Sequence, residues 1–274
     1  MKIYAGPSHQ LGNSLRNTIT MKILADYIGA DFYVNGQCVN NLEHEKDREI
    51  MSCLFRKYLY FGPQYYKLFD ERDIFNFKSY GTTTELIVEG DIKYIPDIDF
   101  AVYYHIYSIK HIDMSIDDYC INKINVYKSL EWPDFLINEV NNFNKKYELI
   151  NLIGIHIRYT DNLTDTQKYN TRLDTFMEKL KTISTPILLC SDNQNVINTI
   201  LNTQQMPNIL LPNKIENYMY QSLYEMMLLS KTKKIIGSYA STFSYEAAFF
   251  IGTDIELYKN NEWKIYDLSK YNSI

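Results

Sequence analysis

The stretch Leu152–Asp161 constrains this chain more than any other feature of its sequence. Its first half is an apolar, β-branched run between polar segments, which is typical of a strand buried on both faces of a parallel sheet. Its second half presents His156, Arg158 and Asp161. Ligands of open α/β sheets bind at the carboxyl ends of the strands, so these side chains stand where a ligand would lie. Arg158 is the principal candidate.

Regular alternation of apolar runs and amphipathic segments follows this stretch to the C-terminus. We expect strands at 152–157, 187–190, 208–211, 234–236 and 255–258, and helices at 171–183, 193–201, 216–229 and 241–250. Strands that alternate with helices of this length predict a parallel sheet with right-handed crossovers. In the usual doubly wound order, the first and fourth of these strands are neighbours at the point where the winding reverses.

The N-terminal part of the chain opens with a β-α-β pattern and then becomes weaker. We expect strands at 2–5 and 31–34 around a helix at 15–28, and later a helix at 50–58, strands at 85–89 and 100–109, and a helix at 134–147. Gly6 and Gly12 match neither the dinucleotide fingerprint nor a P-loop. Because the pattern changes character near Tyr147, we expect two domains, residues 1–147 and 148–274.

Composition and charge exclude several classes of protein. The 274 residues are 46% hydrophobic and carry a net charge of −5, which argues against disorder and against a nucleic-acid groove. The four cysteines lack metal-ligand spacing, so we expect reduced thiols in a cytoplasmic protein. No apolar signal core and no uncharged run of about 18 residues is present, so we expect no membrane anchor.

Three polar clusters follow strands of the C-terminal half and should share one edge of its sheet. They are His156/Arg158/Asp161, Ser191-Asp192-Asn193, and the run from Ser238 to Thr242. Together they suit a nucleotide diphosphate. Ser241 and Thr242 lie at an expected helix N-terminus, where backbone N–H groups and the helix dipole favour an anion.

The other two clusters complete this expected nucleotide site. Arg158 can give a charged, planar fork to phosphate oxygens, with Asp161 holding it in place. Asp192 could accept from the donor edge of a base such as guanine. Each feature also has a structural reading: Ser241 as a plain helix cap, Asp192 as the cap of the next helix, and Arg158–Asp161 as an ordinary ion pair. Their convergence on one edge favours the ligand site.

These segments also resemble a family. The run His156–Asp161 looks like the HxRRxD motif of the superfamily of α1,2-, α1,6- and protein O-fucosyltransferases, and Gly237–Ala248 looks like its later small-residue motif. Ser191-Asp192-Asn193 is similar to the intervening motif, and Leu11-Gly12-Asn13 to the Gly-Asn turn near the N-terminus of these enzymes. One departure is Tyr159, which replaces the second arginine.

The resemblance implies an α/β fold of two Rossmann-like domains with parallel sheets that face each other, the glycosyltransferase B arrangement. It implies an inverting, metal-independent fucosyltransferase, with GDP-fucose as the donor, a glycan or other hydroxyl acceptor, and no further cofactor. Arg158 matches the arginine that contacts the β-phosphate. The remaining donor-contact positions fall on His156, Asp192, Ser241, Thr242 and Phe243.

The acceptor side and the catalytic base are less sharply marked. The resemblance places Gly12, Asn13 and His9 at the cleft, and Asp165 near the position of a family glutamate that could act as the base. Asp165 as a surface carboxylate is the competing interpretation. Asp97-Ile98-Asp99 is a literal DxD, a pattern that binds divalent metal in other glycosyltransferases but is common by chance.

Two other functions remain open from the sequence. One is transfer from a different nucleotide-deoxysugar donor, and the other is a non-catalytic α/β protein that binds a nucleotide or a glycan.

Overall fold

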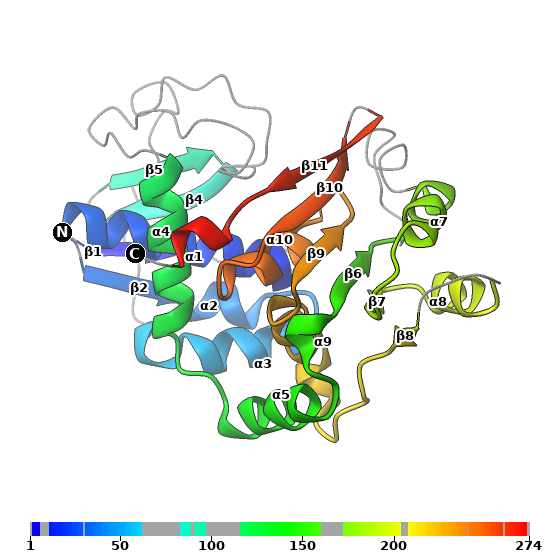
Figure 1. The fold of residues 1–274 in the computed structure, drawn as a ribbon. Helices are drawn as coiled ribbons and strands as arrows, with labels where there is room; N and C mark the ends of the chain where they lie inside the picture. The colour runs from blue at the N-terminus through cyan, green and yellow to red at the C-terminus, as the bar shows by residue number, and fades with distance from the viewer. Residues whose placement is uncertain are drawn as a thin grey trace. The chain divides into compact units, whose positions relative to one another are not determined.

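The computed structural model describes residues 2–5, 11–29, 31–61, 83–88, 91–96, 116–159, 172–203, 208–239, 241–259 and 261–272 (Figure 1). By its internal contacts the chain divides into two compact units, residues 1–133 and 134–273. The division falls between Pro133 and Asp134, earlier in the chain than the change of pattern near Tyr147.

The second unit is built on a six-stranded sheet. Its strands are β6 (Ile153–Ile157), β7 (Ile187–Ser191), β8 (Ile209–Leu210), β9 (Lys234–Gly237), β10 (Ile255–Lys259) and β11 (Glu262–Tyr266). The order across the sheet is β11-β10-β9-β6-β7-β8. β6 pairs in parallel with β9 and β7, which confirms that the first and fourth expected strands are neighbours. The winding therefore reverses beside β6, where a ligand crevice of an α/β sheet opens.

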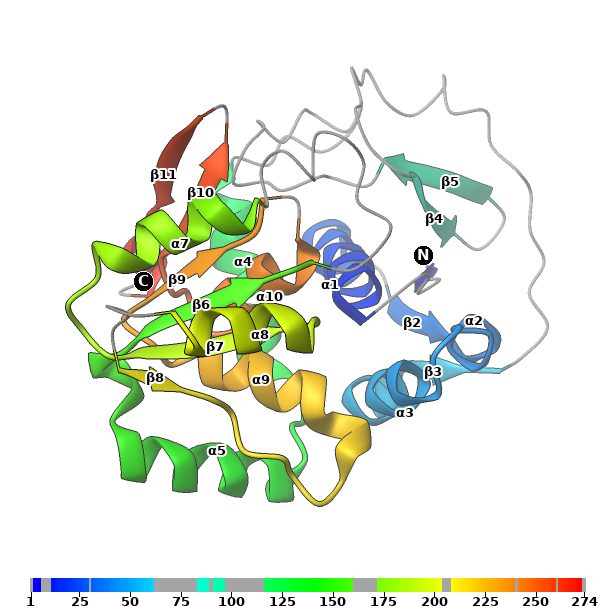
Figure 2. The ribbon, with the colours of Figure 1, turned by 90° about the vertical axis from the view of Figure 1, so that its right-hand side faces the viewer.

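Helices cover both faces of this sheet. The helices of this unit are α5 (Asp134–Tyr147), α7 (Leu173–Lys181), α8 (Gln194–Leu201), α9 (Gln221–Ser230) and α10 (Thr242–Phe249), with short 3₁₀ turns η3 (Leu149–Asn151), η4 (Tyr218–Tyr220) and η5 (Ser269–Tyr271). α7 and α8 lie on one face, and α9 and α10 on the other (Figure 2).

Strand alternation explains this two-sided burial. Ile153, Ile155 and Ile157 of β6 pack with apolar residues of α7 and α8. The opposite face of β6 begins with Gly154, where a Cβ would lie only 2.9 Å from Cδ2 of Leu229 on α9. All five residues of β6 are buried as a result.

Helix α5 groups with the second unit because its buried face packs on that unit. Phe143 makes an edge-on contact with Tyr224 of α9, with ring centroids 6.4 Å apart. Phe135 makes an edge-on contact with Tyr220, with ring centroids 5.1 Å apart. These aromatic contacts place α5 after the unit boundary, although the sequence pattern groups it with the N-terminal half.

The first unit holds a second, five-stranded sheet. Its elements are β1 (Lys2–Ala5), α1 (Leu11–Ile28), β2 (Asp31–Asn35), α2 (Gly36–Asn40), α3 (Glu45–Leu54), η1 (Arg56–Tyr58), β3 (Leu59–Tyr60), β4 (Thr83–Val88), β5 (Asp91–Pro96) and α4 (Ile116–Ser129). The strand order is β3-β2-β1-β4-β5. The expected strand at 100–109 lies outside the described residues.

The expectation of parallel sheets needs correction on one side of the first sheet and at one edge of the second. In the first unit, β4 pairs antiparallel with β1, and β5 antiparallel with β4. In the second unit, β11 pairs antiparallel with β10. The turn into β11 includes Asn261 at a φ of 67°, a left-handed conformation that asparagine tolerates. A hairpin needs no crossover helix, so an antiparallel strand can be added at a sheet edge by a tight turn.

Helix α1 also begins earlier than the periodicity predicts, at Leu11 instead of Leu15. The backbone N–H of Leu11 donates to the carboxylate of Asp47, a buried residue of α3. Burial raises the pKa of Asp47, although Lys46, His44 and this hydrogen bond oppose the shift. A carboxylate from another helix therefore stabilises the start of α1, and Gly12 and Asn13 lie in its first turn.

We predict that Glu256 stabilises the second unit in a pH-dependent way. This buried carboxylate of β10 accepts from Lys179 of α7 at 2.5 Å and from Lys234 of β9 at 2.6 Å. Burial raises the pKa of Glu256, but the two lysine hydrogen bonds outweigh it, so the pKa lies below its ordinary value. Glu256→Gln should lower the free energy of unfolding at pH 7 by about 1–3 kcal/mol.

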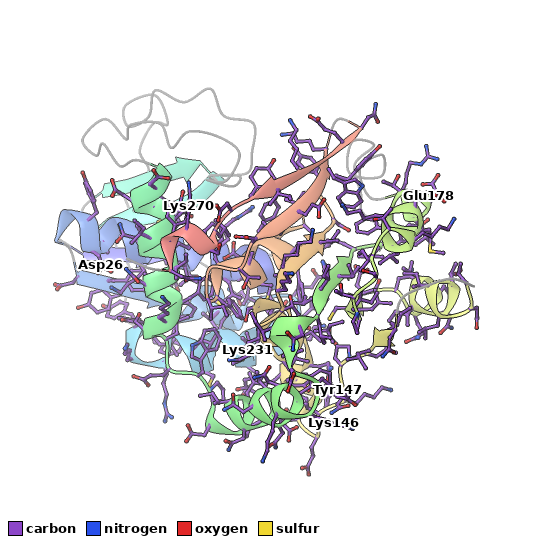
Figure 3. All side chains as sticks on the ribbon, in the orientation of Figure 1. Asp26, Lys146, Tyr147, Glu178, Lys231 and Lys270 are labelled. Carbon is purple, nitrogen blue, oxygen red and sulfur yellow. The ribbon has the colours of Figure 1, made fainter. Side chains whose placement is uncertain are left out.

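The pH dependence and a matched variant check this prediction. Because the folded-state pKa is depressed, the wild-type advantage is full above pH 4.5 and is lost as the pH falls through the folded-state value. Urea unfolding followed by Trp263 fluorescence in a Trp132→Phe background reports the second unit alone. Glu178→Gln, on an exposed pair at the surface of α7 (Figure 3), should change stability by less than about 0.5 kcal/mol. Equal losses in both variants would contradict the prediction.

Candidate functional site

The carboxyl end of β6 is held to the segment that follows β9. The backbone N–H of Ser238 donates to the carbonyl of His156 at 3.1 Å. The hydroxyl of Ser238 in turn accepts from the backbone N–H of Arg158 at 2.9 Å. Arg158 therefore leaves the sheet with a fixed backbone, and its partly buried side chain begins at the edge where the winding reverses.

The segment that follows β7 holds the same backbone from the other side. The hydroxyl of Ser191 donates to the carbonyl of Ile157 at 2.7 Å. The carboxylate of Asp192 accepts from the backbone N–H of Tyr159 at 2.8 Å. The clusters at the ends of β6, β7 and β9 thus meet at one edge, as the sequence predicts.

Asp192 does not cap the following helix, which corrects one structural interpretation. Asn193 is the N-cap of α8, and its side chain accepts from the backbone N–H groups of Asn195 and Val196. Asp192 lies one residue earlier and is exposed. A carboxylate has two acceptor oxygens, so the bond from Tyr159 leaves Asp192 able to accept from a ligand as well.

The N-terminus of α10 lies at the same edge. Ser241 is its N-cap residue, as the sequence predicts, but its side chain makes no capping hydrogen bond. Its hydroxyl is buried, the residue being 1% exposed, and has no hydrogen-bond partner in the described part of the chain. Thr242 and Phe243 open the helix, whose first backbone N–H groups have no acceptor within the helix.

A buried polar group without a partner is uncommon and needs a reason. Ser241 lies at a helix N-terminus that follows Ser238, the residue that holds Arg158. A bound anion would give the hydroxyl and the first-turn amides an acceptor. The described edge therefore combines a guanidinium, helix-terminal amides and a hydroxyl, which suits an anion such as a diphosphate.

The side chain of His156, a residue of β6, is buried against the first turn of α10. Its Nδ1 lies 2.7 Å from the hydroxyl of Ser244, and its ring stacks on Phe243 with centroids 4.5 Å apart. Burial lowers the pKa of His156 to about 4, with Asp192 opposing the shift and Arg158 adding to it. The ring is therefore neutral at pH 7.

Several residues of the site were not singled out from the sequence. Ser238 and Ser244 lie inside the small-residue motif but have no pattern that separates them from their neighbours. Ser191 was grouped only with its cluster. Each acts on the backbone or ring of β6, so its role depends on strand pairing rather than on local sequence.

The remaining candidates fall into two groups. Gly12 and Asn13 lie in α1 of the first unit, where the side chain of Asn13 accepts from Arg16 at 3.3 Å. His9, Asp161, Asp165 and the DxD at Asp97–Asp99 lie outside the described residues. Among the residues that are described, no group of three His, Cys, Asp or Glu could hold a metal ion.

The cysteines and helices add two further observations. Cys53, Cys120 and Cys190 are free thiols. None of the helices in the described ranges is both long and apolar enough to cross a membrane.

The first unit has a groove of about 530 Å³ with a mixed polar and apolar lining at the C-terminal part of α1. Residues of α1, η1 and α4 line it, among them Lys22, Tyr58, Asn122 and Asn125. The ammonium of Lys22 pairs with Asp26 and lies 5.8 Å from the centroid of the Tyr58 ring. Aromatic, amide and charged groups around one groove are the kinds of group that bind sugar rings and hydroxyls.

We predict that His156 makes stability depend on pH below neutrality. The pKa of this histidine is 6.5 in the unfolded chain and about 4 in the folded chain. The free energy of unfolding therefore has its full value above pH 6.5 and falls by roughly 3 kcal/mol towards pH 4. His156→Gln should remove this slope. Urea unfolding at several pH values, followed by Trp263 fluorescence in the Trp132→Phe background, measures it.

The control for this prediction is His44→Gln, a variant of a partly exposed histidine in the first unit. It should keep the slope between pH 6.5 and 4.5, a window that lies above the titration of Glu256. A His156→Gln protein with the wild-type slope would show that another group is responsible.

No protein-family model and no curated protein matches this sequence. Solved structures do resemble it. A crystal structure of NodZ alpha-1,6-fucosyltransferase soaked with GDP-fucose matches with a TM-score of 0.54 and 13% identity, over 97% of this chain and 99% of that one.

Two further NodZ structures match over the same shares of both chains. The fucosyltransferase NodZ from Bradyrhizobium has a TM-score of 0.51, and NodZ co-crystallized with GDP has a TM-score of 0.52, each at 12% identity. These three solved structures are of a fucosyltransferase, and the chain shares their α/β fold along its length.

Proposed function

We propose that this chain is a fucosyltransferase that takes fucose from GDP-fucose and transfers it to a hydroxyl of a glycan, with inversion and without a metal. The observation that supports this most is the hydrogen bond that holds the Arg158 backbone to Ser238, three residues before the N-cap of α10, where the Ser241 hydroxyl is buried without a described partner. The shared fold with NodZ, of which one crystal was soaked with GDP-fucose and another was co-crystallized with GDP, supports the choice of donor.

The proposed reaction depends most on stabilising the charge of the leaving group. Transfer with inversion develops negative charge on the departing diphosphate and positive charge on the sugar. In the proposal Arg158 faces the β-phosphate, and the amides of α10 with Ser241 and Thr242 complete the anion site. Ser238, Ser191 and Asp192 fix the backbone around Arg158, so the point from which its side chain extends is in place before the reaction. A fixed charge needs little reorganisation as the bond breaks.

Other residues complete the donor site in this proposal. Asp192 accepts from the donor edge of guanine, and Phe243 packs at the start of α10 with His156. Asp161 holds the guanidinium of Arg158. Asp165 is proposed as the base that takes the acceptor proton.

The two halves of the chain divide the substrates. The second unit, residues 134–273, forms the donor-binding domain, and the first unit, residues 1–133, forms the acceptor side, to which His9, Gly12 and Asn13 belong. The groove beside Tyr58 offers groups that suit further sugar units of a glycan acceptor.

We predict that guanine nucleotides stabilise the protein. A ligand that binds only the folded state raises the melting temperature by mass action, by an amount equivalent to about 2.7 kcal/mol at 100 times its Kd. A thermal-shift panel of GDP, GDP-fucose, UDP, ADP and dTDP, each with and without chelator, measures this. Shifts with GDP and GDP-fucose that chelator leaves unchanged are expected. A shift only with another nucleotide would exclude fucose, and a chelator-sensitive shift would contradict the metal-free proposal.

We predict that Arg158→Ala loses most of the transferase activity. Removing one preorganised charge contact from the transition state costs on the order of 3 kcal/mol, about a hundredfold in rate. Release of GDP from GDP-fucose in the presence of glycan acceptors measures it. Arg172→Ala removes an exposed arginine that pairs with Asp174 and should keep wild-type turnover.

Two outcomes would reject this mechanism. An Arg158→Ala enzyme with near-wild-type turnover would show that the charge is not used. A wild-type protein that binds GDP but never releases it from GDP-fucose would be a binding protein instead of an enzyme.

A further inference from the structure

The contact between Ser244 and His156 has a definite proton arrangement. Ser244 is fully buried, and its hydroxyl lies 2.7 Å from Nδ1 of His156. In the described part of the chain this hydroxyl has no other hydrogen-bond partner. A single hydrogen bond must therefore satisfy both the serine proton and one nitrogen of the imidazole.

The strand beside β6 makes this contact possible. Gly237 of β9 pairs with His156, and a Cβ at Gly237 would lie 2.6 Å from Cβ of Ser244 and 2.7 Å from its Oγ. The missing side chain lets Ser244 approach the sheet. Its hydroxyl then reaches the imidazole on the adjacent strand, while Phe243 stacks against the same ring.

Only two neutral arrangements fit the contact. If Nδ1 carried the proton, it would donate to Ser244, and the hydroxyl proton would be buried without an acceptor. If Nε2 carries the proton, the hydroxyl donates to Nδ1, and the donor left without a protein partner is the Nε2–H, which is not among the fully buried unpaired atoms of the described residues. Because an unpaired buried donor costs free energy, the second arrangement is favoured.

We propose that Ser244 is a positioning residue that holds His156 as a neutral imidazole with its proton on Nε2, so that this N–H donates to the anion bound by Arg158. The anion half of the inference rests on the proposed function, and the proton arrangement does not. Nε2 has no protein partner in the described ranges, and Arg158 and Asp192 are the charged groups that act on the ring. Burial lowers the pKa of His156 to about 4, which agrees with a neutral ring.

The arrangement gives the site two unlike donors. Arg158 supplies a permanent charge. His156 supplies a directional N–H donor and, as a neutral ring, avoids the cost of burying a second charge. A phosphate oxygen would then meet a donor at a fixed angle, because Ser244 and Phe243 together hold the ring.

Imidazole nitrogen NMR tests the proton arrangement without any substrate. Two-bond ¹H–¹⁵N correlation spectra distinguish the Nε2–H form, the Nδ1–H form and the doubly protonated ring. The protein has five histidines, and the signal missing from His156→Gln identifies His156. At pH 7 the wild-type protein should show the Nε2–H form alone. An Nδ1–H or a doubly protonated ring would overturn the inference.

Ser244→Ala tests the positioning role. Without the hydroxyl, both neutral forms should be populated, and the affinity for GDP should fall by about two- to tenfold, because only the molecules with the proton on Nε2 can donate to the anion. The control is Ser230→Ala, which removes another buried serine hydroxyl, one that donates to the carbonyl of Met227 in α9. It should keep the wild-type imidazole spectrum and GDP affinity.

The two readouts separate the possible failures. An unchanged imidazole spectrum in Ser244→Ala overturns the positioning role. A changed spectrum with unchanged GDP affinity overturns the donation to the anion. If the wild-type protein does not bind GDP at all, the proposed function fails, while the wild-type spectrum still decides which nitrogen carries the proton.

Discussion

The site depends on how the backbone just beyond β6 is held. Three side chains from two other loops bond to consecutive residues there: Ser191 to Ile157, Ser238 to Arg158 and Asp192 to Tyr159. A strand normally loses its pairing at its end, where the chain becomes free to vary. Here the side-chain bonds continue the restraint for two residues past the strand. The backbone from which the Arg158 side chain leaves the sheet is therefore fixed by these bonds.

Sequence reasoning predicted much of the second unit because its elements are local and strongly periodic. The strands around His156, Cys190 and Ile236 and the helices after them lie close to their expected ranges. The neighbour relation of β6 and β9 followed from a general winding rule and is confirmed. The shared edge of the three polar clusters is a consequence of that order.

What sequence reasoning missed was decided by contacts between distant residues. Asp47 starts α1 at Leu11 from another helix, and no local pattern marks it. Helix α4 was not predicted because its buried face mixes tyrosine and lysine with aliphatic residues, Tyr119, Lys123 and Tyr127 among them. β11 was not predicted, although Trp263 and Ile265 alternate with charged residues, which is the pattern of a half-exposed strand. Ser244 has a role only because Gly237 stands opposite it.

The central place of β6 has a consequence for local opening. All five of its residues are buried, and it is paired on both sides, so its amide hydrogens should exchange with solvent only when the whole second unit unfolds. The restraints on Arg158 are anchored to that slowest-exchanging strand. Short-lived fluctuations of the surface helices would therefore leave the restrained backbone around Arg158 in place. The site would lose its structure only when the second unit unfolds.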